Sequence, residues 1–126
     1  MASAGNLFET MRKAIDLRTK EITSSSTVTT YTIRTGGTTY NFIEDAVVEI
    51  TTGDGCDLAI ALPDGTYLGQ KILIKHVVDG GSSTITVTAS TGSGGDSTLD
   101  TAEQYMYVMW IGGTTGWIAL SESVAS

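Results

Sequence analysis

Two side chains could support nucleophilic chemistry, Cys56 and His76, and each is the sole residue of its type in the chain. A thiol beside an imidazole is an arrangement that activates a nucleophile. His76, however, lies in an apolar run between Lys75 and Val77, and no nucleophile motif surrounds it. We therefore expect a packed or interface histidine and a cysteine that acts as a small apolar residue. The sequence predicts no catalytic residue, and a small hydrolase built on this pair is the third alternative.

Three acids could bind a hard cation such as Ca²⁺, which prefers several oxygen ligands. Asp54, Asp57 and Asp64 lie close together in the sequence, near turns. The run from Gly53 to Asp57 lacks the spacing of a calcium-binding loop, and aspartate is common in turns because its carboxylate accepts bonds from backbone N–H groups. We therefore predict turn residues here, with no metal site and no cofactor.

Aromatic residues gather near the C-terminus, where they could stack on sugar rings or pack inside a protein. Polar and glycine-rich segments interrupt this region, and the loop at Gly92–Gly95 precedes no helix, which argues against a phosphate site. We favour core packing or a subunit interface over a glycan platform. The residues assigned to that core or interface are Tyr105, Tyr107, Met109, Trp110 and Trp117.

The elements that would position these side chains are mostly strands. Apolar residues alternate with small or polar ones in several short runs, which glycine-rich turns separate. This pattern predicts a mainly β protein whose body is a compact antiparallel β-sandwich or barrel-like structure, with residues 71–78 and 83–89 forming one hairpin. The expected strands are 27–34, 38–44, 46–52, 58–62, 71–78, 83–89, 104–111 and 117–120.

One segment predicts a helix, at residues 6–22. Asn6 can cap it, and apolar residues recur every four positions along one face. We expect three parts in the chain: a helical arm at 1–22, a linker rich in Ser and Thr at 23–26, and a β body at 27–126. The side chains with which the arm would contact a partner are Leu7, Phe8, Met11, Arg12, Ile15, Arg18 and Ile22. Packing of the helix on its own body is the alternative.

Charge divides along the chain. The net charge of the 126 residues is −7, yet residues 1–22 carry four cations against three acids. The acidic remainder argues against nucleic-acid binding, which needs clustered cations. A single cysteine allows no internal disulfide, and the sequence contains no signal-peptide pattern and no run of 18 apolar residues. We therefore expect a protein made in the cytoplasm, without a membrane partner.

The C-terminal half also contains an ordered set of short motifs: Leu62-Pro63, Gly69, Gln70–Lys75, Thr84–Val87 and Gly116-Trp117. This order resembles a recurrent module of bacteriophage structural proteins. In that module a strand ends in Leu-Pro, a glycine precedes Gln-x-Ile-x-Ile-Lys, a Thr-Ile-Thr-Val strand follows, and a final hairpin ends in Gly-Trp. The module occurs in tail fibres, head fibres and capsid decoration (cement) proteins, commonly as homotrimers, and it contributes no catalytic residues.

What the resemblance implies is a virion protein. A fibre usually contains a repetitive stalk or a coiled coil, and no heptad run is present here. We therefore expect a homotrimeric decoration protein that binds the major capsid protein on the outer surface of the head and stabilises it. The N-terminal helix, which the module does not supply, would be the arm that attaches it. The alternative is a head- or tail-fibre module that binds a receptor or glycan.

Overall fold

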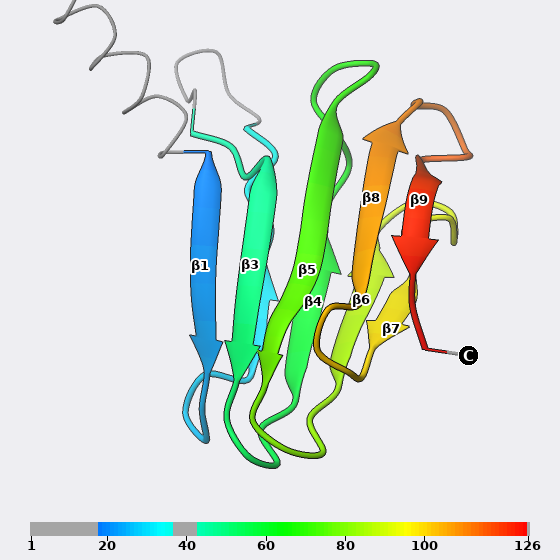
Figure 1. Cartoon of the computed structure of the whole chain (residues 1–126). Helices are drawn as coiled ribbons and strands as arrows, with labels where there is room; N and C mark the ends of the chain where they lie inside the picture. The colour runs from blue at the N-terminus through cyan, green and yellow to red at the C-terminus, as the bar shows by residue number, and fades with distance from the viewer. Residues whose placement is uncertain (1–17, 37–42, 126) are drawn as a thin grey trace, which may run out of the picture.

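The computed structural model describes residues 18–36 and 43–125, which form two stacked β-sheets (Figure 1). A five-stranded sheet has the strand order β1-β3-β5-β8-β9, and a four-stranded sheet has the order β2-β4-β6-β7. The strands are β1 (Thr19–Ser24), β2 (Thr30–Thr32), β3 (Val47–Thr52), β4 (Leu58–Leu62), β5 (Lys71–Asp79), β6 (Ile85–Ala89), β7 (Ser97–Leu99), β8 (Tyr105–Trp110) and β9 (Trp117–Ser123).

From β1 to β6 the chain coils between the sheets. Each strand passes to the opposite sheet, so β1, β3 and β5 are parallel neighbours in one sheet, and β2, β4 and β6 are parallel neighbours in the other. After β6 the pattern changes, because β7 pairs antiparallel with β6 and β8 pairs antiparallel with β5 and β9. The body is therefore a three-turn coil followed by an antiparallel closing section.

The mainly β class is confirmed, whereas the antiparallel arrangement is wrong, since four of the seven strand pairings are parallel. The segments 71–78 and 83–89 do not form the predicted hairpin: β5 lies in one sheet and β6 in the other. The turn at Gly80-Gly81 reverses the chain, but it crosses the space between the sheets. A reversal signal in sequence does not say which sheet receives the next strand.

The predicted helix is wrong over its last part. Residues 1–17, which hold most of it, lie outside the described residues, while Thr19–Ser24 forms β1 and pairs with β3. Ile22 is 6% exposed and belongs to the core between the sheets. Thr23 and Ser24, assigned to the linker, also belong to the strand. Ile22 satisfies both the helical repeat and the two-residue period of a strand, so the pattern alone did not place the boundary.

Other expected strands correspond to observed ones with shifted ends. Residues 27–34 contain only the short β2, and 104–111 contain β8. Part of the expected strand 38–44 lies outside the described residues, and Ile43 and Glu44 are not in a strand. Strand β7 was not predicted. Its three residues are too few to show a period.

The core lies between the two sheets and consists mainly of branched aliphatic side chains. In β4 the order buried–exposed–buried follows Leu58, Ala59 and Ile60, as a strand with one covered face requires. Val48 and Ile50 of β3 also point inward, while Val47 faces outward and is half-buried. Burial of each such side chain contributes about 1.5–3 kcal/mol, so this layer is the main source of the stability of the body.

Stacked turns join successive levels of the coil at the end where β1, β3 and β5 finish. The Gly53 N–H donates to the Ser24 carbonyl at 3.2 Å, and the Gly55 N–H donates to the Gly81 carbonyl at 2.7 Å. The Ser83 hydroxyl, itself buried, donates to the Gly53 carbonyl at 2.6 Å. These bonds satisfy backbone groups that the sheets do not pair.

The first level of the coil is closed by charged side chains. Lys20 of the edge strand β1 points inward, and its Nζ lies 5.5 Å from the centre of the Tyr31 ring. The Tyr31 hydroxyl donates to Asp45 at 2.6 Å, and Arg34 donates to Asp45 through two side-chain nitrogens, at 2.9 and 2.6 Å. An inward-pointing lysine on an edge strand opposes the addition of a further strand from another molecule. Lys20 therefore protects the β1 edge against such pairing.

Candidate interaction surfaces

The outer faces of the two sheets differ in composition. The outer face of the four-stranded sheet, here the threonine face, carries small exposed residues: Thr30, Thr32, Ala59, Ala61, Thr86 and Thr88. The outer face of the five-stranded sheet, here the aromatic face, carries large half-buried or exposed ones: Val47, Leu73, Val78, Tyr105, Tyr107, Met109 and Ile118. The aromatic face is therefore the more apolar of the two outer faces.

The structure divides the five residues that the sequence assigned to a core or interface. Trp110 and Trp117 are buried, 8% and 0% exposed, and their rings meet edge to face with centroids 5.4 Å apart. The Trp117 indole donates to the Pro63 carbonyl at 3.0 Å. Tyr105, Tyr107 and Met109 alternate with the buried Met106, Val108 and Trp110 along β8 and lie on the aromatic face. The set therefore contains two core residues and three residues of an outer surface.

A second apolar surface lies at the end of the sandwich where β1 begins, here the loop end, at the top of Figure 1. Its exposed members are Leu68 at 75%, Tyr67 at 48% and Ile111 at 38%. The Gln70 N–H donates to the Tyr67 carbonyl, and Gly69 has a φ of 87°, as the third residue of a type II turn requires. This turn projects Leu68 into solvent.

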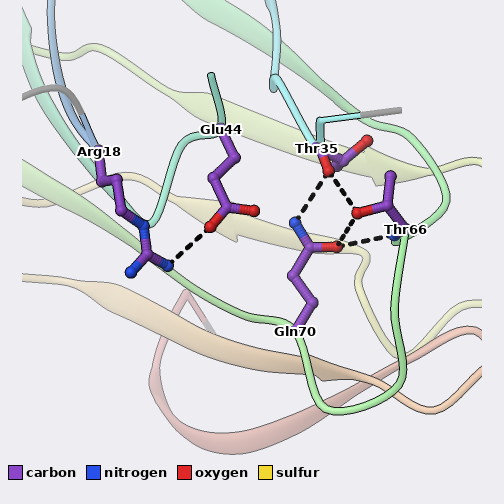
Figure 2. A network of polar contacts seen from close by, with 5 residues as sticks. All are labelled: Arg18, Thr35, Glu44, Thr66 and Gln70. Atoms are coloured by element: carbon purple, nitrogen blue, oxygen red, sulfur yellow. Dashed lines mark hydrogen bonds and ion pairs between the residues drawn. The ribbon is translucent and has the colours of Figure 1, made fainter. Parts of the chain in front are cut away.

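A buried glutamine anchors the loop that carries Leu68 (Figure 2). Gln70 is 1% exposed; its Oε1 accepts the Thr66 N–H at 2.8 Å, and its Nε2 donates to the Thr35 carbonyl at 3.2 Å. The Thr66 hydroxyl donates to the same Thr35 carbonyl at 2.8 Å. Because each amide atom has a partner, the loop is tied to the segment after β2, and Leu68 is presented from a fixed position.

Arg18, which the sequence assigned to the arm, lies at the same end of the body. Its guanidinium pairs with Glu44 at 2.9 Å (Figure 2), and β1 follows at once. The pKa of Tyr67 is raised by burial first and then by the negative charge of Glu44. Arg18, Glu44 and Tyr67 thus interact where residues 1–17 join the body. Of the other arm residues, Ile22 is in the core, and the remaining five lie outside the described residues.

The structure places His76 where it cannot meet a substrate from solvent. The ring is 0% exposed, and its Nε2 lies 2.9 Å from the Thr52 hydroxyl. The Cys56 thiol has a different partner, since its sulfur lies 3.5 Å from the Asp54 carbonyl oxygen. No hydrogen bond between Cys56 and His76 exists among the described residues.

The acids near the turns form hydrogen bonds to the protein itself. Asp57 accepts the N–H of Thr84, a residue 27 positions away, at 2.9 Å, so this bond joins two separate turns. Asp64 accepts the hydroxyls of Thr91 and Ser90, and these bonds lower its pKa. Among residues 18–36 and 43–125, no group of three or more His, Cys, Asp or Glu side chains is placed to hold a metal ion, and no helix is long and apolar enough to cross a membrane.

A groove of about 590 Å³ runs beside the threonine face. Serine and threonine hydroxyls and small side chains line it, together with Asp54, Cys56 and Asp57.

The glycine loop near Gly92–Gly95 lies apart from these residues. A Cβ on Gly94 would approach the Trp117 carbonyl oxygen to 2.2 Å. The loop therefore packs against the β8–β9 hairpin, which explains its lack of side chains.

The sequence matches no protein-family model, and a search of curated proteins finds no significant similarity.

Proposed function

We propose that this chain is a capsid decoration (cement) protein of a bacteriophage, which binds the outer surface of the head as a homotrimer and stabilises it. The ordered motifs from Leu62-Pro63 to Gly116-Trp117, which resemble phage structural modules, support this function. The observation that carries it is the loop end, where Leu68 is 75% exposed on an anchored turn. An exposed patch of large apolar side chains is typical of a surface that a partner covers.

In this proposal the loop end faces the capsid. Tyr67, Leu68 and Ile111 are its exposed apolar residues. Residues 1–17, which precede Arg18 in the sequence, contain further apolar residues and two cations balanced by two acids. Apolar area removed from water contributes about 25 cal/mol per Å². Copies bound across the joints between capsid subunits would therefore oppose separation of those subunits under the pressure of packaged DNA.

The first test separates the arm from the body. Removing residues 1–17 leaves β1 intact, so the shortened chain is expected to fold and self-associate but to lose binding to expanded capsids. Binding is measured by co-sedimentation with capsids and by counting copies per particle. Normal decoration by the shortened chain would show that the arm is not the attachment element.

The second test concerns the loop end. Replacing Leu68 by Ser should weaken capsid binding by roughly ten- to a hundredfold, because burial of a leucine contributes about 1.5–3 kcal/mol. Leu120→Ser is the matched control, since Leu120 is 44% exposed at the β9 bulge, within a different element. Equal effects of the two substitutions would mean that the loop end is not the contact.

A receptor- or glycan-binding module of a head or tail fibre is the second candidate, and the hydroxyl-lined groove beside the threonine face favours it. Serine, threonine and aspartate side chains can bond sugar hydroxyls. The aromatic rings near the C-terminus do not line this groove: Trp110 and Trp117 are buried, and Tyr105 and Tyr107 lie on the outer face of the other sheet. Binding on a glycan array that Asp57→Ala abolishes would favour this candidate. Hundreds of copies per head without glycan binding would eliminate it.

A further inference from the structure

The loop end is one continuous apolar surface made by two loops. The turn that carries Leu68 is tied to the end of β8, because the Gly69 N–H donates to the Trp110 carbonyl at 2.8 Å. Leu68 also reaches the loop that follows β8, since a Cβ on Gly112 would lie 3.2 Å from the Leu68 Cδ2. Ile111 lies between Trp110 and Gly112 in the chain. The exposed side chains of the two loops are therefore held close together.

The first residue that the structure describes, Arg18, lies at the edge of this surface. Arg18 pairs with Glu44 at 2.9 Å. Burial, and then the negative charge of Glu44, raise the pKa of Tyr67, which directly precedes Leu68 in the chain. Residue 17 is bonded to Arg18, so the segment 1–17 starts beside the exposed apolar side chains with no spacer between them.

The segment 1–17 has a composition that suits an apolar surface. Leu7, Met11 and Ile15 recur every four positions, with Phe8 beside them, and this spacing predicts one apolar stripe on a helix. A helix over residues 6–17 would be about 18 Å long, which is roughly the width of a four-stranded sheet. A helix of this length is only marginally stable by itself and needs a surface on which to lay its stripe.

We propose that residues 1–17 lie on the loop end of their own chain in the free protein, with the apolar stripe against Tyr67, Leu68 and Ile111, and leave it when the capsid binds. The segment is then an autoinhibitory cover on the surface that contacts the capsid. The cover itself concerns the free chain and stands without the proposed function. Only its release by the capsid rests on that function.

The covalent connection favours this segment over other occupants. A segment joined to the surface by a short connection is present at an effective concentration of roughly millimolar, whatever the concentration of the protein. A second copy or another protein would have to reach a similar concentration, and it loses translational and rotational freedom on binding. Charge does not oppose the contact, because the segment has two cations and two acids and Arg18 is already paired with Glu44.

A cover that contacts three side chains can be exchanged for a larger partner. If it is present in about nine-tenths of the free molecules, the apparent affinity for the capsid is about tenfold weaker, because only the uncovered fraction can bind. Once the capsid displaces the cover, the loop end and the apolar stripe become available together. The cover also shields Leu68 from unspecific contacts before the capsid is reached.

The first experiment measures where the segment lies in the free, full-length chain. A spin label is attached at Thr10→Cys, which lies outside the apolar stripe, in a Cys56→Ser background. Amide NMR signals are recorded with the label oxidised and then reduced. The amides of Leu68 and Gly112 should lose most of their intensity while the label is oxidised. The amide of Gly81, at the opposite end of the sandwich, should keep its intensity.

A matched control keeps the label and the covalent connection but removes the stripe, through Leu7→Ser, Phe8→Ser and Ile15→Ser. In this variant Leu68 and Gly112 should keep their intensity. Equal losses with and without the stripe would show that the connection alone brings the label close, and no loss in either chain would place the segment elsewhere. Losses that arise only between a labelled copy and a second, isotope-enriched copy would assign the cover to a neighbour. Each of these results overturns the proposal.

The second experiment locks the cover in place. Leu68→Cys is combined in turn with Leu7→Cys, Met11→Cys or Ile15→Cys, again in the Cys56→Ser background. At least one pair should form an intramolecular disulfide on oxidation of the free chain, and Leu120→Cys in place of Leu68→Cys should form none. Failure of all three pairs, or equal crosslinking to Leu120→Cys, would contradict the cover.

Capsid binding then tests the release. The crosslinked chain should lose binding to expanded capsids, and reduction of the same chain should restore it. Equal binding in the oxidised and reduced states would show that the cover does not have to leave. If the natural chain never binds capsids while the spin-label result holds, the cover is retained and the decoration function is removed, so the two proposals fail separately.

Discussion

The His76 imidazole is held inside the sandwich by a single hydroxyl. Its Nε2 lies 2.9 Å from Thr52 Oγ1, and its Nδ1 has no hydrogen-bond partner among the described residues. The same threonine hydroxyl lies 3.4 Å from the Val78 carbonyl and from the Gly80 N–H. A single side chain therefore joins a core histidine to the turn that ends β5, and its contribution is structural.

Replacing Thr52 by Val keeps the shape and removes the hydroxyl, which should lower the free energy of unfolding by about 1–3 kcal/mol, the cost of a buried polar group without a partner. Thr52→Ser, which retains the hydroxyl, should cost less. Adding His76→Leu to Thr52→Val should recover part of the loss, because both polar groups are then gone. Urea denaturation measures all four chains, and a double variant no more stable than Thr52→Val would contradict this account.

Alkaline pH should weaken the cluster at the first level of the coil. Burial, and then the bond to Asp45, raise the pKa of Tyr31 to about 12. An unfolded tyrosine ionises near pH 10. The contribution of protonated Tyr31 to the free energy of unfolding is therefore complete below pH 10 and is lost as the pH rises towards 12. The stability difference between the natural chain and Tyr31→Phe should therefore shrink over this range, as followed by denaturation between pH 9 and 12. If the stability difference between the two chains stays the same from pH 9 to 12, ionisation of Tyr31 does not weaken the cluster.

At the scale of elements, the turns decide how the strands are connected. The corner after β5 packs on the corner after β3: a Cβ on Gly80 would lie 2.4 Å from the Thr52 carbonyl oxygen and 2.7 Å from the Gly53 carbonyl carbon. Both contacts are with backbone, which cannot rotate away. Glycine at this corner therefore permits the close stacking on which the parallel coil depends.

Gly80→Ala should lower the free energy of unfolding by about 1–3 kcal/mol or more, the cost of overpacking a tight contact. Gly113→Ala is the control: Gly113 has a φ of 63° and no atom within 4 Å of its added Cβ, so it should cost only the left-handed strain of about 1–2 kcal/mol. Thermal unfolding compares the two. A larger loss in Gly113→Ala would mean that the corners are not closely stacked.

At the scale of the whole molecule, the surfaces of the sandwich differ in composition. The core between the sheets contains both tryptophans, the threonine face is small and polar, and the aromatic face and loop end retain large apolar residues. The C-terminal tail connects the layers, since the Ala125 N–H donates to the Thr98 carbonyl of β7 at 2.9 Å. Of these surfaces of the body, the capsid contact proposed above uses only the loop end, where Leu68 is 75% exposed.

The division between arm and body predicts different results for two truncations. Deleting residues 1–22 removes most of β1 and the core residue Ile22, so the remaining chain should lose at least about 2–5 kcal/mol, the usual cost of truncating one large core side chain. Deleting residues 1–17 leaves all of β1. Melting temperatures compare the two chains, and equal stability would show that β1 is dispensable to the body.

Local patterns in the sequence determined the class of the fold and several strands. The alternation of Leu58, Ile60 and Leu62 with alanines requires a strand with one buried face, and strands β8 and β9 follow from their own apolar runs and glycine turn. The alternation along β8 likewise separates Tyr105 and Tyr107 from Trp110. Hydrophobic periodicity depends on residues that are close in sequence, so it can be recognised without the tertiary structure.

Tertiary structure alone decided which sheet each strand joins and which face of each strand is covered. Gly80-Gly81 reverses the chain equally well in a hairpin or in a crossing between sheets, and packing against the Gly53 corner selects the crossing. Trp110 points inward because the second sheet lies on that side of β8, which leaves Tyr107 outside. Ile22 fits a helix or a strand, and its pairing opposite Ile50 makes it a strand residue. These outcomes depend on contacts between segments far apart in the chain, which no local pattern contains.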